Sequence, residues 1–225
     1  MSFAFAKQPN NKARGPLRFL ALILDLFFPR KCVACNTFGE SICKNCFARI
    51  KKIHEPLTIP NLDCVYAIYR YEKHGVLQMA IKALKYRFIR DIAIYFRQDL
   101  GDFLIENFSK KDCVLVPIPL HPKREKWRGF NQSEELIRGL AWPIIKPLKR
   151  TRNTIPQAEL DRTKRLVNLN GAFAIREKIQ TRFLNKKIVL IDDISTTGAT
   201  LCECAKVLKQ AGAKEIYGVI LAHGS

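Results

Sequence analysis

Two neighbouring carboxylates stand directly before a hydroxyl-rich turn in the stretch KKIVLIDDISTTGATL, residues 186 to 201. The run from Ile188 to Ile191 is short and β-branched, which is typical of a buried strand, and residues 199 to 211 have helical spacing. A strand, a polar turn and a helix therefore follow one another. In an open α/β sheet, a turn at the carboxyl end of a strand is the usual place for a ligand.

This turn has the composition of a phosphate site. Its residues are Ser195, Thr196, Thr197, Gly198, Ala199 and Thr200. The hydroxyls are donors, the glycine allows close backbone approach, and the free N–H groups of a helix start point toward an anion. Asp192 and Asp193 would repel phosphate, so we expect them to face sugar hydroxyls or a hydrated cation. A phosphorylated sugar satisfies both halves. The alternative is an acidic strand end before a helix that Thr196 or Thr197 caps.

Four cysteines form a second candidate site. Cys32, Cys35, Cys43 and Cys46 follow the pattern C-x2-C, seven residues, C-x2-C. This spacing allows four thiolates to surround one zinc ion tetrahedrally. The segment has little apolar content, so we expect a structural zinc ion to supply most of its folding free energy. Two disulfides or a redox-active pair are the alternatives, and reducing conditions in the cytoplasm disfavour the disulfides.

Cations cluster after another strand-like segment, within DCVLVPIPLHPKREKWRGFNQSEELIRGL at residues 112 to 140. The strand, residues 113 to 116, leads to a proline-bounded loop, and a helix begins near Asn131. The loop contains Lys123, Arg124, Lys126 and Arg128. Loops at the carboxyl ends of two parallel strands can face one cleft. In a reaction that expels pyrophosphate, such cations would stabilise the charge that grows on the leaving group.

A third polar block, QAELDRTKRLVNLNGAF at residues 157 to 173, contains Arg162, Lys164 and Arg165. It could form a mobile flap that closes over the ligand and excludes water. Exclusion of water matters because a transition state that resembles a ribosyl cation would otherwise be hydrolysed. The alternative is a surface helix with basic residues.

The rest of the chain must supply a framework that positions these groups. We expect a strand within residues 62 to 71 and helices at residues 76 to 88 and 92 to 108. With 225 residues and 48% apolar content, the chain can bury the core of one domain plus a small satellite. The expected parts are a flexible basic arm (1–16), a helix with the four-cysteine ribbon (17–55) and a main domain (56–225), joined by a linker near residues 51 to 60.

The chain is strongly basic, with 39 Lys and Arg against 20 Asp and Glu and a net charge of +19. Such a charge favours polyanionic partners. It suits nucleic acid and a polyphosphate substrate equally well, and a basic solvated surface is the plain alternative.

The apolar run from Phe19 to Phe28 follows basic residues, as it would in a signal peptide. Asp25 interrupts the run, no small-residue cleavage site follows, and the run is too short to span a bilayer. We therefore expect a short helix that ends at Pro29, no transmembrane segment and a cytoplasmic protein.

Two resemblances follow from these motifs. The run VLIDDISTTGAT resembles the phosphoribosyl pyrophosphate (PRPP) motif of type I phosphoribosyltransferases. Together with the cysteine pattern, PIPLHPKREKWRGFNQ and QAELDRTKRLVNLNGAF, in this order, it resembles the ComF family of competence-associated proteins, from about Leu17 onward. The resemblance implies an α/β type I phosphoribosyltransferase fold, an open and mostly parallel sheet flanked by helices, with a small N-terminal zinc ribbon. It also implies a role in the uptake of transforming DNA.

The resemblance implies roles for individual residues. Asp192 and Asp193 would hold the ribose, residues 195 to 200 the 5′-phosphate, and Lys123, Arg124 and Arg128 the pyrophosphate, with Mg²⁺ bridging. The two acids and the two arginines are the expected catalytic residues. The chain departs from purine-salvage enzymes, which place an acid three residues after the second acid of the pair, where this chain has Thr196. Oxopurine chemistry is therefore disfavoured, and the acceptor is unidentified.

Three functions fit these motifs. The first is a PRPP-binding phosphoribosyltransferase-like protein that contacts single-stranded DNA through its ribbon and basic surface. The second is a non-catalytic DNA-processing adaptor that uses the phosphate pocket as a sensor, and the third is a nucleotide-salvage enzyme. A DNA helicase or a recombination factor is the partner that the resemblance implies. Tyr86, Phe88, Trp127 and Phe130 lie near basic residues and could stack on bases, although core packing is the alternative use for most of them.

Overall fold

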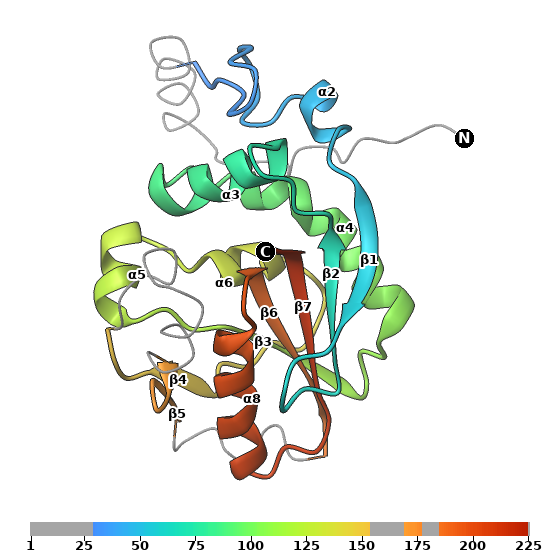
Figure 1. Cartoon of the computed structure of the whole chain (residues 1–225), viewed down its shortest axis with the longest axis vertical. Coiled ribbons are helices and arrows are strands. Elements are labelled where there is room, and N and C mark those ends of the chain that lie inside the picture. The colour runs from blue at the N-terminus through green and yellow to red at the C-terminus, as the bar shows by residue number, and fades with distance from the viewer. Residues whose placement is uncertain (1–28, 154–168, 177–184, 225) are drawn as a thin grey trace, which may run out of the picture.

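The computed structural model describes residues 29–153, 169–176 and 185–224 of the chain (Figure 1). Its centre is a five-stranded sheet in the order β1-β2-β7-β6-β3. The strands are β1 (Lys52–Leu57), β2 (Cys64–Tyr69), β3 (Cys113–Pro117), β6 (Lys187–Ser195) and β7 (Ile216–His223). All neighbours are parallel except β1, which pairs antiparallel with β2 at one edge. The expected open, mostly parallel sheet is confirmed.

Helices cover both faces of this sheet, as the two separate clusters of buried side chains show. They are α2 (Lys44–Phe47), α3 (Val76–Tyr86), α4 (Ile92–Asn107), α5 (Pro122–Arg128), α6 (Gln132–Ile137) and α8 (Ala199–Gln210). Side chains of α3, α4 and α6 fill one cluster, and those of α8 fill the other. A small antiparallel sheet of β4 (Leu148–Arg150) and β5 (Phe173–Ile175) packs on the α8 side.

The inner strand β6 begins with a continuous apolar run, residues 188 to 191. Ile188 and Leu190 belong to the cluster under α8, whereas Val189 and Ile191 belong to the cluster under α3 and α4. Successive side chains of a strand that is covered on both faces enter two different cores, so this part of β6 is apolar at every position. The carboxyl ends of β6 and β7 point toward α3 (Figure 1).

The N-terminal ribbon is packed firmly on the main fold. Cys32, Ile42 and Cys46 are buried in the same cluster as the side chains of α3 and α4. The Phe47 ring lies 5.8 Å from the Phe96 ring on α4, centroid to centroid. The ribbon therefore shares a core with the helices of the sheet.

The segment that follows the ribbon differs from our expectation. Residues 52 to 57 form the edge strand β1, which pairs with β2 from Lys52↔Tyr69 to Leu57↔Val65. A linker near residues 51 to 60 is therefore wrong, because the chain passes from the ribbon directly into the sheet (Figure 1). The expected limit between residues 55 and 56 falls inside this strand.

Other expected elements are confirmed, with two changes around the candidate site. The strand within residues 62 to 71 and the helices from residues 76, 92 and 199 are present as β2, α3, α4 and α8. The basic segment expected as a loop is the helix α5, because His121 caps its first turn by accepting a hydrogen bond from the Lys123 N–H at 3.2 Å. Strand β6 continues through both aspartates to Ser195.

Several expectations fall outside the described residues. These are the arm at residues 1 to 16, the helix at residues 17 to 28 and most of the expected flap, including Arg162 and Arg165. Within the described ranges, no helix has the length and apolar character needed to cross a membrane.

Gly198, which begins α8, occupies a position that only glycine fits well. Its φ is +75°, in the left-handed region. A Cβ atom there would lie 2.9 Å from the Cδ1 atom of Ile59, a buried core residue. The turn after the aspartates is therefore pressed directly against the core.

We expect Gly198→Ala to lower the free energy of unfolding by roughly 2 to 4 kcal/mol, because backbone strain and overpacking add. The matched control is Gly129→Ala, whose φ is +80° but whose Cβ would meet nothing within 4 Å. Urea denaturation measures both. Equal losses in the two variants would show that the contact with Ile59 is unimportant.

Candidate functional site

A cleft of about 260 Å³ opens at the carboxyl end of β6, beside α3, α5 and α6. It combines two acids with a larger number of cations. The charged residues that line it are Asp192, Asp193, Lys82, Lys85, Arg124, Arg128 and Arg150. Among the described residues, five cations against two acids leave a surplus of positive charge when all are ionised. The cleft therefore suits a ligand with several negative charges.

Asp192 is buried, with 8% of its surface exposed. Its Oδ1 atom accepts hydrogen bonds from the Ser133 hydroxyl on α6, at 3.0 Å, and from the Asp193 N–H, at 2.9 Å. Burial, and then the charge of Asp193, raise the pKa of Asp192 to about 7. Near neutral pH this carboxyl is therefore poised between its two protonation states.

Asp193 is held by a residue that the sequence did not indicate. Its Oδ2 atom lies 2.7 Å from the Nζ atom of Lys85 on α3, and the two side chains are only 2% and 18% exposed. Its Oδ1 atom accepts the Ile194 N–H at 2.9 Å. Lys85 lies in a segment whose apolar spacing indicates only a helix. No neighbouring residue in the sequence marks it as a site residue.

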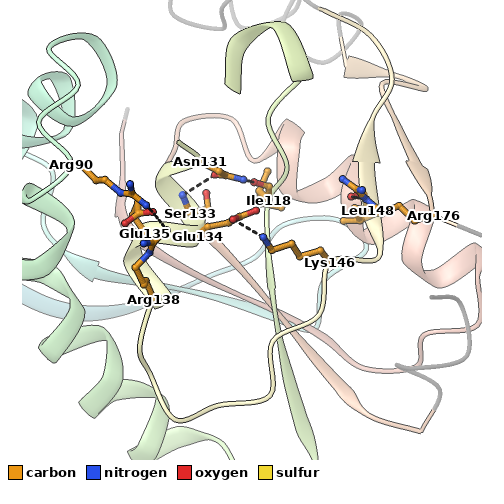
Figure 2. A network of polar contacts seen from close by, with 10 residues as sticks. All are labelled: Arg90, Ile118, Asn131, Ser133, Glu134, Glu135, Arg138, Lys146, Leu148 and Arg176. Atoms are coloured by element: carbon orange, nitrogen blue, oxygen red, sulfur yellow. Dashed lines mark hydrogen bonds and ion pairs between the residues drawn. The ribbon is translucent and has the colours of Figure 1, made fainter. Parts of the chain in front are cut away.

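Helix α6, which presents Ser133 to Asp192, is fixed at its N-terminus (Figure 2). The Asn131 amide donates to the Ile118 carbonyl at 2.9 Å, and its Oδ1 atom accepts the Ser133 N–H at 3.0 Å. Asn131 therefore caps α6 and also ties it to the end of β3. The helix begins where the sequence predicted.

Ion pairs hold the rest of α6 (Figure 2). Buried Glu135 pairs with Arg90, at 2.5 Å, and with Arg138, at 2.9 Å. Glu134 pairs with Lys146 at 2.6 Å. Three segments of the chain thus converge on a helix of six residues, which keeps Ser133 directed at Asp192.

The turn after β6 divides the predicted phosphate-binding residues into two groups. Thr196 and Thr200 line the cleft. The Ser195 hydroxyl instead accepts the Gly198 N–H at 3.1 Å, and the Thr197 hydroxyl accepts the Ala199 N–H at 3.4 Å. Ser195 and Thr197 therefore shape the turn. The N-cap position belongs to Gly198, so neither Thr196 nor Thr197 occupies it.

Two of the basic residues that line the cleft, Arg128 and Arg150, are buried. Arg128 is 7% exposed and donates from Nη1 to Gln132 Oε1 at 2.5 Å, and burial lowers its pKa. Arg150, which the sequence did not single out, is 9% exposed, and burial together with the charge of Arg124 lowers its pKa to about 10. Both remain cations at neutral pH. Lys123, which we predicted to bind PRPP, is exposed and does not line the cleft.

The four predicted zinc ligands converge at the tip of the ribbon. Their sulfur atoms all lie within 4.8 Å of one another, and Cys35 and Cys43 are 3.6 Å apart. Tetrahedral zinc with bonds of about 2.3 Å places its sulfurs about 3.8 Å apart. The cluster therefore fits a structural zinc ion.

The thiols of this cluster differ in acidity. The Thr37 hydroxyl and N–H lower the pKa of Cys35 to about 6, whereas burial raises that of Cys46 to about 12. A bound cation deprotonates a coordinating thiol outright. Zinc would therefore make thiolates of both residues.

Comparison with protein families matches two parts of the chain. Residues 128–224 match the phosphoribosyl transferase domain, and residues 23–57 match the double zinc ribbon domain. These matches agree with the sheet and with the cysteine cluster, and they confirm the expected fold class. The ribbon match extends through β1, consistent with the absence of a linker there.

Three relatives from different bacteria match parts of the chain. The competence protein ComFC of Bacillus subtilis is 30% identical over 173 residues, which cover 77% of this chain and 68% of the relative. ComFC of Streptococcus pneumoniae is 33% identical over 199 residues, with 82% and 84% covered. The DNA utilization protein YhgH of Escherichia coli K12 is 35% identical over 108 residues, with 45% of each chain covered.

A solved purine phosphoribosyltransferase from Pyrococcus horikoshii is 22% identical, with 60% of this chain and 72% of that chain covered. The TM-score is 0.28.

We expect one zinc ion per chain, and we expect its removal by a strong chelator to lower the melting temperature. The ribbon shares a core with α4, so loss of the metal exposes that core. Elemental analysis and thermal unfolding measure both effects. Cys35→Ser should lose the metal, whereas Cys64→Ser, a cysteine outside the cluster, should keep it. A zinc-free protein with unchanged stability would contradict the assignment.

The raised pKa of Asp192 predicts a pH-dependent stability. The unfolded carboxyl ionises near pH 4 and the folded one near pH 7, so its contribution is lost as the pH rises through this window. Asp192→Asn keeps the hydrogen-bond acceptor without the charge. Its gain in unfolding free energy over the native protein should grow between pH 5 and 8 by at least about 1 kcal/mol, the equivalent of one pKa unit.

The control for this measurement is Asp102→Asn, an exposed acid on α4. Denaturant titrations at several pH values should show that the free energy of unfolding of this variant changes with pH in parallel with that of the native protein. If the free energy of unfolding of Asp192→Asn also changes with pH in parallel with that of the native protein, the Asp192 carboxyl of the native protein is ionised normally.

Proposed function

Because the chain belongs to the ComF family, we propose that it acts in natural transformation, binding PRPP in the cleft beside Asp192 and Asp193. Two relatives are named competence proteins and a third is named for DNA utilization, which supports a role in DNA uptake. The observation that carries the PRPP proposal is the meeting of two buried acids with five cations in one cleft. We place the protein in the cytoplasm.

The cleft offers complementary groups for each part of PRPP. Carboxylate oxygens of Asp192 and Asp193 accept hydrogen bonds from ribose hydroxyls. Thr196 and Thr200, with the N-terminus of α8, face the 5′-phosphate. The arginines Arg124 and Arg128 on α5 can then take the pyrophosphate, because guanidinium groups match phosphate geometry.

Magnesium would accompany PRPP. The two aspartates provide carboxylate oxygens, the ligand type that Mg²⁺ takes together with substrate phosphates. The ion would neutralise part of the phosphate charge.

Phosphoribosyl transfer in this cleft would break the bond between the ribose C1 atom and the pyrophosphate oxygen, and form a bond from C1 to an acceptor. Negative charge grows on the departing pyrophosphate, where Arg124, Arg128 and Arg150 would stabilise it. Thr196 at the position where purine-salvage enzymes carry an acid argues against an oxopurine acceptor, and hence against the salvage alternative.

One observation favours the second candidate, a non-catalytic adaptor that senses a phosphorylated ligand. Lys85 already occupies Asp193, so a sugar that used this acid would have to displace a buried ion pair or share it. Breaking such a pair costs about 3 to 5 kcal/mol when one partner is left uncompensated. A polyanion that contacts only the cations of the cleft leaves this pair intact and avoids that cost, so it can be held without its sugar being positioned for transfer.

Contact with single-stranded DNA is the other part of the proposal. In the ribbon, Phe38 is 62% exposed and carries Lys31 Nζ at 4.8 Å from its ring centroid. An exposed aromatic ring beside a cation suits a stacked base and its phosphate. A helicase or recombination factor of the transformation machinery is the partner class that we propose.

Calorimetry with Mg-PRPP tests the cleft. We expect binding by the native protein, and loss of at least roughly 100-fold in affinity for Asp192→Ala with Asp193→Ala, since two hydrogen-bond acceptors for the sugar are lost. The control is Asp102→Ala on α4, away from the cleft. Unchanged affinity in the double variant would refute the site.

Pyrophosphate release separates the enzyme from the adaptor. The protein is mixed with Mg-PRPP and with pools of bases, nucleosides or single-stranded DNA. Release that depends on one pool, and that the double variant lacks, supports transfer. Tight PRPP binding without release in any pool supports the sensor.

A further inference from the structure

Two large aromatic side chains meet on the surface although they are far apart in the sequence. Phe88, just beyond α3, is 41% exposed, and Trp127 on α5 is 60% exposed. Their ring centroids are 4.8 Å apart and their planes are nearly perpendicular, at 85°. We call these two residues the aromatic pair. Each ring is stabilised by its neighbour, yet a large part of both remains in contact with solvent.

The aromatic pair lies next to residues that line the cleft. Trp127 lies between Arg124 and Arg128 on one short helix, and both arginines line the cleft. On the other side, Tyr86 lines the cleft and is 54% exposed, two residues before Phe88. A ligand that leaves the cleft on this side therefore passes over aromatic surface.

The backbone at Phe88 is strained. Its φ is +56°, in the left-handed region that bulky residues seldom adopt. Such a conformation persists where the surroundings impose it, and it often marks a functional position. Because the ring is not buried, core packing does not account for a phenylalanine here.

The surroundings of the aromatic pair are basic. From residue 82 to residue 90 the chain has Lys82, Lys85, Arg87 and Arg90 and no acid, and α5 has four cations against the single Glu125. Lys85 and Arg90 are engaged with acids, whereas Arg87, Lys123 and Lys126 are exposed. Exposed cations can bind the phosphates of single-stranded nucleic acid, and exposed rings can stack on its bases.

We propose that the aromatic pair is a stacking site for a base of single-stranded DNA, with the strand running across the mouth of the cleft. This inference rests on the proposed DNA contact and adds its location. A free base is a poorer match, because small-molecule pockets bury most of their ligand and Trp127 is largely open to solvent. A strand gains phosphate contacts along with stacking, so an open platform suffices.

Fluorescence anisotropy with a labelled 20-mer of deoxythymidine tests this site. We expect Phe88→Leu and Trp127→Leu each to weaken binding by roughly 5- to 100-fold, the loss typical of one stacking contact. The slope of log K against log salt should stay the same, because the phosphate contacts are retained. Ile105→Ala, an equally exposed apolar residue on α4, should bind like the native protein.

A second measurement removes the bases in place of the side chains. With an abasic oligonucleotide of the same length, the native protein and both variants should bind equally, since stacking is absent from all of them. The emission of Trp127 should be quenched by the thymidine strand and not by the abasic one. Trp142 is 7% exposed, so its emission should stay constant when DNA binds. The Trp127→Leu variant contains only this tryptophan and therefore measures that background.

The outcomes separate this site from the broader proposal. If Phe88→Leu and Trp127→Leu bind the thymidine strand normally while Phe38→Leu in the ribbon is weakened, the aromatic pair is not the stacking site and the DNA contact stands. If the native protein binds neither strand, both proposals fail. Circular dichroism confirms that each variant is folded.

Discussion

The structure depends on keeping two adjacent carboxylates buried near the end of the inner strand β6. Burial and mutual repulsion both disfavour a second charge, so each acid needs a partner from another element. Lys85 reaches Asp193 from α3, and Ser133 reaches Asp192 from α6. The ends of β3 and β6, the capped start of α6 and the last turns of α3 must therefore meet at one point. That meeting defines the walls of the cleft.

The surplus of cations follows from the same geometry. Arg128 and Arg150 are buried close to the acids, and burial lowers the pKa of each. Together with the other three cations of the cleft they outnumber the two acids, and their charges keep a strong field because little water screens buried groups. The field attracts a polyanion, while the acids restrict the site to ligands with hydroxyls or a bound cation. Binding of either would favour the ionised form of Asp192 and release its proton.

The ribbon and the cleft belong to one packed body in the described residues. The ribbon rests on α4 through Phe47, and β1 leads from it into the sheet. Helix α4 in turn holds Arg97, which donates to the Glu135 carbonyl on α6 at 2.8 Å. Zinc binding and the position of α6 are thus linked through packed side chains. The proposed DNA contact at the ribbon and the proposed ligand site in the cleft would therefore be connected through packed side chains.

The sequence by itself determined the local units: the apolar run of β6, the cysteine pairs, the turn glycine and the asparagine that starts α6. Each is set by interactions within a few residues, so spacing and composition reveal it. Only the tertiary structure decided the partners. Lys85 and Arg150 carry no local signal, because their roles arise from segments more than 40 residues apart along the chain that meet at one strand end. For the same reason the sequence could propose Phe88 and Trp127 as stacking residues, while their contact became visible only in the fold.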